Sequence, residues 1–365
     1  MRLRLVAAVC FVVFSGHAHA QQVADTTFST DRGFYPSPVS VTISSETPGA
    51  LISYTTDGSP PGASGGQESP VVVQVEQSMP LRALAYVSDG SLDPTNIDTH
   101  TYVILSNPMR WNGKSFATSA AYPAAVVESL KSLPALFVSM RPSDFATVRD
   151  SGSGGIGQSG ANEQYERPCS AELWYPAHAR YQGFAGFQID AGLRPHSWVT
   201  TKRSFRLYFK RQYGAGKLRY PIFESAPWAG ESAVEEFDKL VLRHHSNDGW
   251  EGRWGGAEEA LYLRDQFARA CQIDMGGLGA RSMWAHLFIN GAYYGIYSPC
   301  ERPDDDFLAS YLGGDDDDYL GFNHGGVIND GADESIYNAY RNPGDLNGYA
   351  AYETFQGVLD PAQFS

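Results

Sequence analysis

Short stretches of alternating apolar and polar residues, separated by turn clusters, dominate residues 25–104. Three of these stretches are Val39–Ile43, Leu51–Thr55 and Leu81–Ala85. Because successive side chains of a strand point to opposite faces, each stretch predicts a half-buried β-strand. The residues between them are rich in Gly, Pro, Ser and Asp, as at Asp57–Pro61, which favours tight turns. Short strands with such regular turns predict a small β-sandwich that needs no helix.

The order of motifs in this region resembles that of the chitobiase/β-hexosaminidase C-terminal-type domain. The motifs are Tyr54-Thr-Thr-Asp-Gly-Ser-Pro-Pro61, then Leu81-Arg-Ala-Leu-Ala85, then a closing Thr101-Tyr102. The resemblance implies an immunoglobulin-like sandwich that is an accessory domain of a secreted protein and not its catalytic part. Within the first motif, Asp57-Gly58 is interpreted as a hairpin turn and not as a ligand site.

The first twenty residues have the parts of a secretory signal peptide. Arg2 and Arg4 are positively charged, Val6–Phe14 is a short apolar run, and Ala18-His-Ala20 is a small-x-small cleavage site. The apolar run is shorter than the roughly 20 residues that span a bilayer. We therefore expect residues 1–20 to be removed on export. The mature protein would then be secreted, or held at the cell surface or in the periplasm, without a transmembrane segment.

The chain is acidic, with 41 Asp and Glu against 27 Lys and Arg and a formal net charge of −14. An acidic surface repels nucleic acid and anionic lipid, and no run of Lys and Arg exceeds two residues, so we expect no nucleic-acid partner. The mature chain would keep Cys169, Cys271 and Cys300, an odd number that permits at most one internal disulfide. The sequence does not decide the state of these three thiols. It contains no CxxC pair, which argues against a zinc ribbon.

Beyond the predicted sandwich, strand patterns mix with helical ones. We interpret residues 105–160 as a connector with a first buried strand at Leu133–Met140. Residues 161–365 then carry further strand patterns, at Ser170–Tyr175, Phe184–Leu193, Phe205–Phe209 and Lys239–Arg243. They also predict a helix at Glu258–Cys271 with a core-facing apolar stripe, a hairpin around Asn290-Gly291, and a short helix at Asp304–Leu312. The fold class expected from these patterns is α+β.

Several segments of this second region occur in the order found in the CotH family of atypical, secreted protein-kinase-like proteins. They are Glu166-Arg-Pro-Cys-Ser-Ala-Glu172, Gly192-Leu-Arg-Pro-His-Ser197, Lys202-Arg-Ser-Phe-Arg-Leu207, Leu218-Arg-Tyr-Pro-Ile-Phe223, Leu263-Arg-Asp265, and Asn290-Gly-Ala-Tyr-Tyr-Gly-Ile-Tyr297 followed by Glu301. The resemblance rests on their order over residues from about 130 to 365. It implies an atypical protein-kinase-like α+β domain that uses ATP and Mg²⁺ to phosphorylate a protein acceptor.

The same resemblance implies which residues bind the nucleotide. It places Lys202 where a lysine neutralises phosphate oxygens, Arg194 and Ser197 in the neighbouring loop, and Glu301 at the hinge between two lobes. Taken alone, Lys202 also fits a solvated lysine at a strand edge, and Glu301 fits a surface ion pair. Pro195 stands where the family has a glycine after the loop arginine, so we expect the loop backbone to differ.

The catalytic residues are not identified by the sequence. Phosphoryl transfer needs one carboxylate that orients the acceptor hydroxyl and another that holds Mg²⁺. In the family these follow the point at which this chain stops. Leu359–Ser365 has the pattern of a helix start, with Asp360 as N-cap and Pro361 at the first helical position. We therefore expect a domain that is incomplete at its C-terminus, either a fragment or a natural truncation, and inactive by itself.

Two other classes of function stay open. One is a non-catalytic cell-surface or carbohydrate-binding scaffold with an extracellular polysaccharide as its partner, and the other is a carbohydrate-active enzyme. The acidic runs Asp304–Asp306 and Asp315–Asp318 lack the spacing of an EF-hand and are interpreted as solvated surface. His244 and His245 are adjacent on a predicted strand and would point to opposite faces, which disfavours a shared metal ion. The acceptor and the oligomeric state are not determined.

Overall fold

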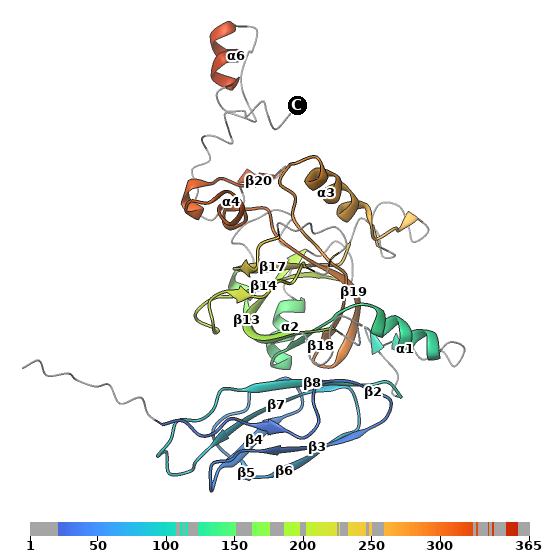
Figure 1. Cartoon of the computed structure of the whole chain (residues 1–365), viewed down its shortest axis with the longest axis vertical. Helices are drawn as coiled ribbons and strands as arrows, with labels where there is room; N and C mark the ends of the chain where they lie inside the picture. The colour runs from blue at the N-terminus through green and yellow to red at the C-terminus, as the bar shows by residue number, and fades with distance from the viewer. Residues whose placement is uncertain are drawn as a thin grey trace, which may run out of the picture.

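The computed structural model describes residues 21–106, 123–150, 163–175, 186–197, 202–224, 233–245 and 259–323, and short pieces at 110–111, 114–115, 226, 248–249, 326–327, 335, 338 and 348–356. The predicted signal peptide and the helix start predicted at residues 359–365 lie outside the described residues. The described part is α+β, with many short strands and a few helices. Its N-terminal region is a sandwich of sheets and its second region is built around a barrel (Figure 1).

The N-terminal region consists of two packed β-sheets, as the alternation pattern predicted. One sheet has the order β1-β3-β6, with β1 at Thr27–Phe28, β3 at Val39–Ser44 and β6 at Val71–Val75. The other has the order β2-β8-β7-β4-β5, formed by β2 (Gly33–Tyr35), β8 (Asp98–Ile104), β7 (Met79–Tyr86), β4 (Leu51–Thr55) and β5 (Gln67–Glu68). Every second residue of the longer strands is buried between the sheets, among them Val41, Ile43, Ile52, Leu81 and Ala83.

Seven strands of the second region close into a barrel with the order β11-β12-β13-β14-β17-β19-β18. Their bounds are β11 Ala135–Ser139, β12 Arg167–Trp174, β13 Gly186–Ser197, β14 Ser204–Tyr208, β17 Lys239–Arg243, β18 Ala285–Ile289 and β19 Ala292–Cys300. Neighbouring strands are antiparallel, except that β11 and β18 run parallel and complete the ring. Inward-pointing apolar side chains fill the barrel, as expected of a small barrel, among them Leu136, Leu173, Leu193, Leu207, Leu242 and Leu287.

The Asn290-Gly291 hairpin between β18 and β19 is confirmed. Asn290 has φ 48° and Gly291 has φ 78°, and two successive positive φ values are what a type I′ hairpin turn requires. The strands predicted from residues 133–140, 170–175, 184–193, 205–209 and 239–243 are also present, as β11, β12, β13, β14 and β17. Three further two-stranded ladders pair β9 (Arg110–Trp111) with β10 (Lys114–Ser115), β15 (Leu218–Arg219) with β16 (Glu236–Phe237), and β20 (Phe322–Asn323) with β21 (Gly326–Val327).

The helices α1 (Pro123–Ser132), α2 (Pro142–Asp150), α3 (Arg264–Asp274) and α4 (Asp305–Leu312) lie beside the barrel, whereas α6 (Tyr349–Gln356) lies apart from it (Figure 1). The prediction of a helix from Glu258 was wrong, because α3 begins at Arg264. Tyr262 has φ 57°, a left-handed conformation that a helix cannot continue through. The expected core stripe is also wrong: Phe267 is 71 % exposed and the buried α3 residue is Gln266. Among the described helices, none has the length and apolar character needed to cross a membrane.

Candidate functional site

The strands β13, β14 and β17 carry basic side chains on the outside of the barrel. In β14, Phe205 and Leu207 point into the core, so Arg206 between them points outward. Arg194 of β13 pairs with Arg206, and Arg206 pairs with Val241 of β17, so these positions share one face. We call this surface the outer basic face and define it as Arg194, His196, Arg206, Tyr208, Lys239 and Arg243.

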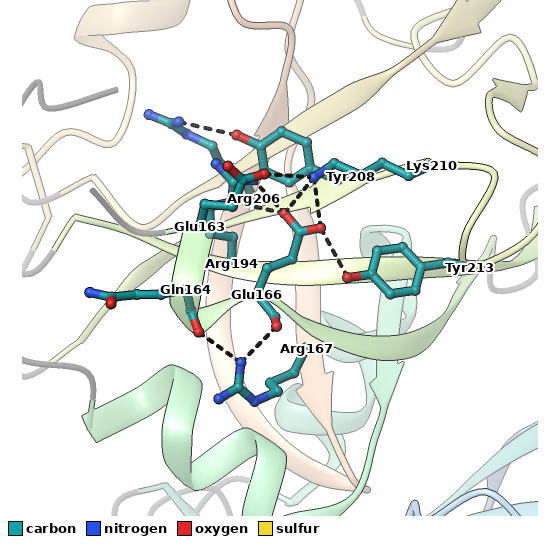
Figure 2. A network of polar contacts seen from close by, with 9 residues as sticks. All are labelled: Glu163, Gln164, Glu166, Arg167, Arg194, Arg206, Tyr208, Lys210 and Tyr213. Atoms are coloured by element: carbon teal, nitrogen blue, oxygen red, sulfur yellow. Dashed lines mark hydrogen bonds and ion pairs between the residues drawn. The ribbon is translucent and has the colours of Figure 1, made fainter. Parts of the chain in front are cut away.

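A buried carboxylate, Glu166, anchors one end of the outer basic face (Figure 2). Arg194 donates to Glu166 Oε2 through Nε at 2.9 Å and Nη2 at 2.6 Å, so both donors of one guanidinium edge are engaged. Lys210 Nζ lies 2.9 Å from Glu166 Oε1, and the Tyr213 hydroxyl donates to the same oxygen at 3.0 Å. Burial raises the pKa of Glu166, but the hydrogen bonds from Lys210 and Arg194 outweigh it and hold this pKa below its ordinary value. Glu166 therefore stays ionised and fixes both cations.

The Tyr208 ring contacts two cations. The guanidinium of Arg194 is 4.1 Å from the ring centroid and the ammonium of Lys210 is 5.0 Å from it, distances at which a ring quadrupole attracts a cation. Arg206 Nη1 donates to the Tyr208 hydroxyl at 3.3 Å (Figure 2). The aromatic ring therefore holds the basic side chains side by side on the barrel surface.

Three nitrogen atoms on this face are buried and have no hydrogen-bond partner among the residues that the structure describes: Nε of Arg206, Nδ1 of His196 and Nε of Arg243. Arg243 Nε lies in an ion pair with Asp265, so Arg206 Nε and His196 Nδ1 are the two without a charged partner in the described part of the chain. Burial, followed by the charges of Arg206, Arg302 and Arg243, places the pKa of His196 well below its ordinary value, so the imidazole is neutral. The nearby guanidinium groups therefore add to burial in keeping His196 neutral, and they supply positive charge at this face. Such a face suits an anion with several oxygen acceptors.

Of the four residues predicted from the family resemblance, Lys202, Arg194 and Glu301 have separate partners within the protein. Lys202 Nζ donates to the Ile296 carbonyl at 2.9 Å and lies 4.6 Å from the Tyr297 ring centroid, beside β19. It precedes Arg206 by four residues, about 13 Å along a strand. Arg194 belongs to the Glu166 network. Ser197 ends β13, where it pairs with Ser204 after a bulge, and its side chain is outside the described part.

Glu301 follows β19 directly, where the chain leaves the barrel for α4, and its side chain lies inside the protein. It is 4 % exposed. Its Oε2 accepts the Arg281 backbone N–H at 2.7 Å, and its Oε1 accepts the Tyr311 hydroxyl at 2.8 Å. Burial raises the pKa of Glu301 to about 7, although hydrogen bonds from Arg281 and Tyr311 act in the other direction. Glu301 therefore links the barrel to α4 and titrates near neutral pH.

The acidic run at the start of α4 is only partly solvated. Asp304 is 1 % exposed, so the expectation of a solvated surface is wrong for this residue. Lys239 Nζ lies 2.9 Å from Asp304 Oδ2 and also contacts Asp306, which explains the burial. Carboxylate oxygens of Asp304, Asp305 and Asp306 come within 4.8 Å of one another, the one such His, Cys, Asp or Glu group among the described residues. Lys239 Nζ contacts Asp304 and Asp306, so two of the three carboxylates are already engaged by an ammonium, and the cluster does not fit a Mg²⁺ site.

The remaining metal and redox candidates have separate partners. His244 Nδ1 is 2.6 Å from Ser204 Oγ, while the His245 ring packs on Tyr262 with centroids 5.4 Å apart. The two adjacent histidines therefore do not converge on one point. The thiols of Cys169, Cys271 and Cys300 are free, and the first and last are buried.

The sequence did not single out Glu166, Arg206 and Lys210. A weak signal for Arg206 was available, because a charged residue between two apolar residues of a strand must face away from the core. Glu166 and Lys210 lie 44 positions apart and meet only through the strand pairing, which no local pattern encodes.

Two protein families match separate parts of this chain. Residues 30–96 match the chitobiase/beta-hexosaminidase C-terminal domain, and residues 195–356 match the CotH kinase protein family. The two regions therefore occur in the order that the motifs predicted. Among curated proteins, none matches this chain. The second match begins one residue after Arg194 and includes Arg206 and Glu301. Glu166, which immediately precedes β12 of the barrel, lies before the start of this match.

Proposed function

We propose that this CotH kinase-like chain is exported and binds ATP on the outer basic face, in support of phosphoryl transfer to a protein acceptor. The observation that carries the proposal is Nε of Arg206, which is buried and has no hydrogen-bond partner among the described residues, beside the guanidinium of Arg194 that Glu166 fixes. Arg206 lies within the region that matches the kinase family, and Arg194 lies next to it. Guanidinium groups present paired N–H donors that match the oxygens of a phosphate. The predicted signal peptide supports export.

The residues of this face fit a polyphosphate better than they fit a metal ion. Arg206 and His196 offer nitrogen positions that have no described partner, and Arg194 is held in place by Glu166. Lys202 would have to leave the Ile296 carbonyl to reach a phosphate. Bound MgATP supplies the transferable phosphoryl group, and the metal neutralises part of its charge. Because Lys239 already pairs with Asp304 and Asp306 in the acidic cluster, we assign nucleotide binding to the described residues and no catalytic step.

Titration of the protein with a non-hydrolysable ATP analogue tests this assignment. We expect binding in the presence of Mg²⁺, and a loss of about 10- to 100-fold in affinity for Arg206→Ala, the range that one charge-assisted hydrogen bond worth about 1.5–3 kcal/mol implies. Arg219→Ala is the matched control, because Arg219 is 69 % exposed and pairs with Glu236 outside the outer basic face. Equal affinity of the two variants would contradict the assignment. Retention on chitin or cellulose without nucleotide binding would support the carbohydrate-binding scaffold instead.

A further inference from the structure

The sheet of the sandwich that contains β7 and β8 is buried on both of its faces. Residues such as Leu81 and Tyr102 point between the two sheets. On the opposite face, Thr99, Thr101 and Val103 are at most 1 % exposed. An isolated sandwich of antiparallel sheets leaves this outer face to solvent. Here it lies against the barrel, and Figure 1 shows β2, β7 and β8 directly beside the barrel strands.

A buried ion pair crosses the contact between sandwich and barrel. Glu172 of β12 is fully buried and accepts Arg32 Nη1 of the sandwich at 2.6 Å. Thr101 of β8 donates its hydroxyl to the other carboxylate oxygen at 2.6 Å, and Arg32 Nη2 donates to Gln188 Oε1 of β13 at 3.1 Å. Burial raises the pKa of Glu172, against the charge of Arg32. The carboxylate therefore depends on partners that the sandwich supplies.

An apolar cluster joins the same two regions. The ring of Phe34, from β2, lies 4.9 Å from the Trp174 ring and 6.1 Å from the Phe288 ring of the barrel, centroid to centroid. Val103 of β8 is fully buried in the cluster that contains Phe137 and Phe288. Contacts of this kind exclude water and resemble the inside of one domain more than the surface between two.

The backbones of the two regions also approach closely at two glycines. A Cβ at Gly291, in the β18–β19 turn, would lie 2.5 Å from the Ser78 carbonyl oxygen of the sandwich. A Cβ at Gly58, in the sandwich, would lie 2.6 Å from the Met140 carbonyl oxygen at the end of β11. Each turn therefore sits against the backbone of the other region without space for a side chain.

We propose that the sandwich is a structural brace of the barrel, and that the two regions unfold as one cooperative unit, with the Arg32–Glu172–Thr101 contact holding β12 in place. Glu172 and Glu166 belong to the same chain segment, since Glu166 immediately precedes β12. The brace therefore also sets the position of the carboxylate that anchors the outer basic face. The proposal goes beyond nucleotide binding and does not depend on it.

Hydrogen–deuterium exchange of the whole chain tests the brace, with peptides that report separately on β7–β8 and on β12–β13. In the unmodified protein we expect one unfolding transition in urea for both groups of peptides. Arg32→Ala leaves the Glu172 carboxylate buried without its cation, a change that costs roughly 3 kcal/mol, or about 100-fold. Exchange should therefore rise about 100-fold in both groups. Arg219→Ala, which removes an exposed arginine from an ion pair within the barrel region, should change neither.

A milder variant keeps the test decisive if Arg32→Ala does not fold. Thr101→Val preserves the shape of the side chain and removes only the hydroxyl that donates to Glu172. We expect a rise of about 5- to 10-fold in exchange, again in both groups of peptides. Separate transitions for the two regions, or a rise confined to β7–β8, would overturn the proposal and show that the sandwich is an independent appendage.

Discussion

Replacing Glu301 by glutamine is expected to stabilise the protein at pH 8 much more than at pH 5. The pKa of Glu301 is about 7 in the folded protein, raised from 4.5 by burial, with Arg281 and Tyr311 opposing the shift. Between these two values the folded state binds more protons than the unfolded state, so the free energy of unfolding falls as the pH rises. A glutamine at this position would carry no such dependence, because its amide does not ionise.

The magnitude follows from the two pKa values. The contribution of Glu301 to stability is fully present below pH 4.5 and is lost as the pH rises through 7. At about 1.36 kcal/mol for each pKa unit, the loss between pH 5 and pH 8 is about 2.5 kcal/mol. The side chain is 4 % exposed, so solvent screening does not reduce this figure substantially.

Urea denaturation of the protein and the E301Q variant at pH 5, 6, 7 and 8 measures this difference. Subtracting one curve of stability against pH from the other removes the titration of groups common to both proteins. Glu236→Gln is the control, because Arg219 and Lys217 lower the pKa of this exposed carboxyl and its removal should give no gain at pH 8. A difference that is flat with pH, or a variant that loses stability at pH 8, would refute the argument that burial dominates the electrostatics of Glu301.

Two further substitutions test the packing and the buried charges of the barrel region. Phe288→Ala removes a ring that is 1 % exposed in the cluster between sandwich and barrel, and it should lower the free energy of unfolding by about 3–5 kcal/mol in urea denaturation. Lys239→Met leaves the buried Asp304 carboxylate without its ammonium and should cost about 3 kcal/mol, measured in the same way. Adding Asp306→Asn should recover part of that loss, because it removes the second carboxylate that Lys239 paired with and so reduces the uncompensated negative charge beside Asp304. No recovery would show that Asp306 is not coupled to Lys239.

Local patterns predicted the elements of the fold well. Alternation identified the sandwich strands because one face of each is buried between two sheets, and the Asn290-Gly291 dipeptide identified its hairpin because both residues tolerate a positive φ. The start of α3 was missed because Asp248, from outside the helix, accepts the backbone N–H groups of Leu261 and Arg264. That contact lies beyond the reach of a sequence window.

The site was harder to predict because its contacts join distant positions. Arg194 meets Glu166 28 residues earlier, and Lys239 meets Asp304 65 residues later. The sequence shows that Asp304 carries a carboxyl group. Only the fold shows that this group is buried and that the Lys239 ammonium offsets the cost of burying its charge. The motifs predicted Arg194 as a nucleotide-binding residue, and the strand register shows that Arg206 lies beside it on the same face.

The parallel pairing of β11 with β18 has a consequence for how the chain reaches its native state. Ala135 pairs with His286 and Val138 with Ile289, about 150 residues apart. Contacts of such long sequence separation form late and slowly, since a long loop must close first. Until β18 arrives, β11 presents an unpaired edge that can template aggregation. The risk of aggregation through β11 should therefore fall only after residues 285–300 are available to pair with it. This favours keeping the chain unfolded until the whole barrel sequence has been synthesised.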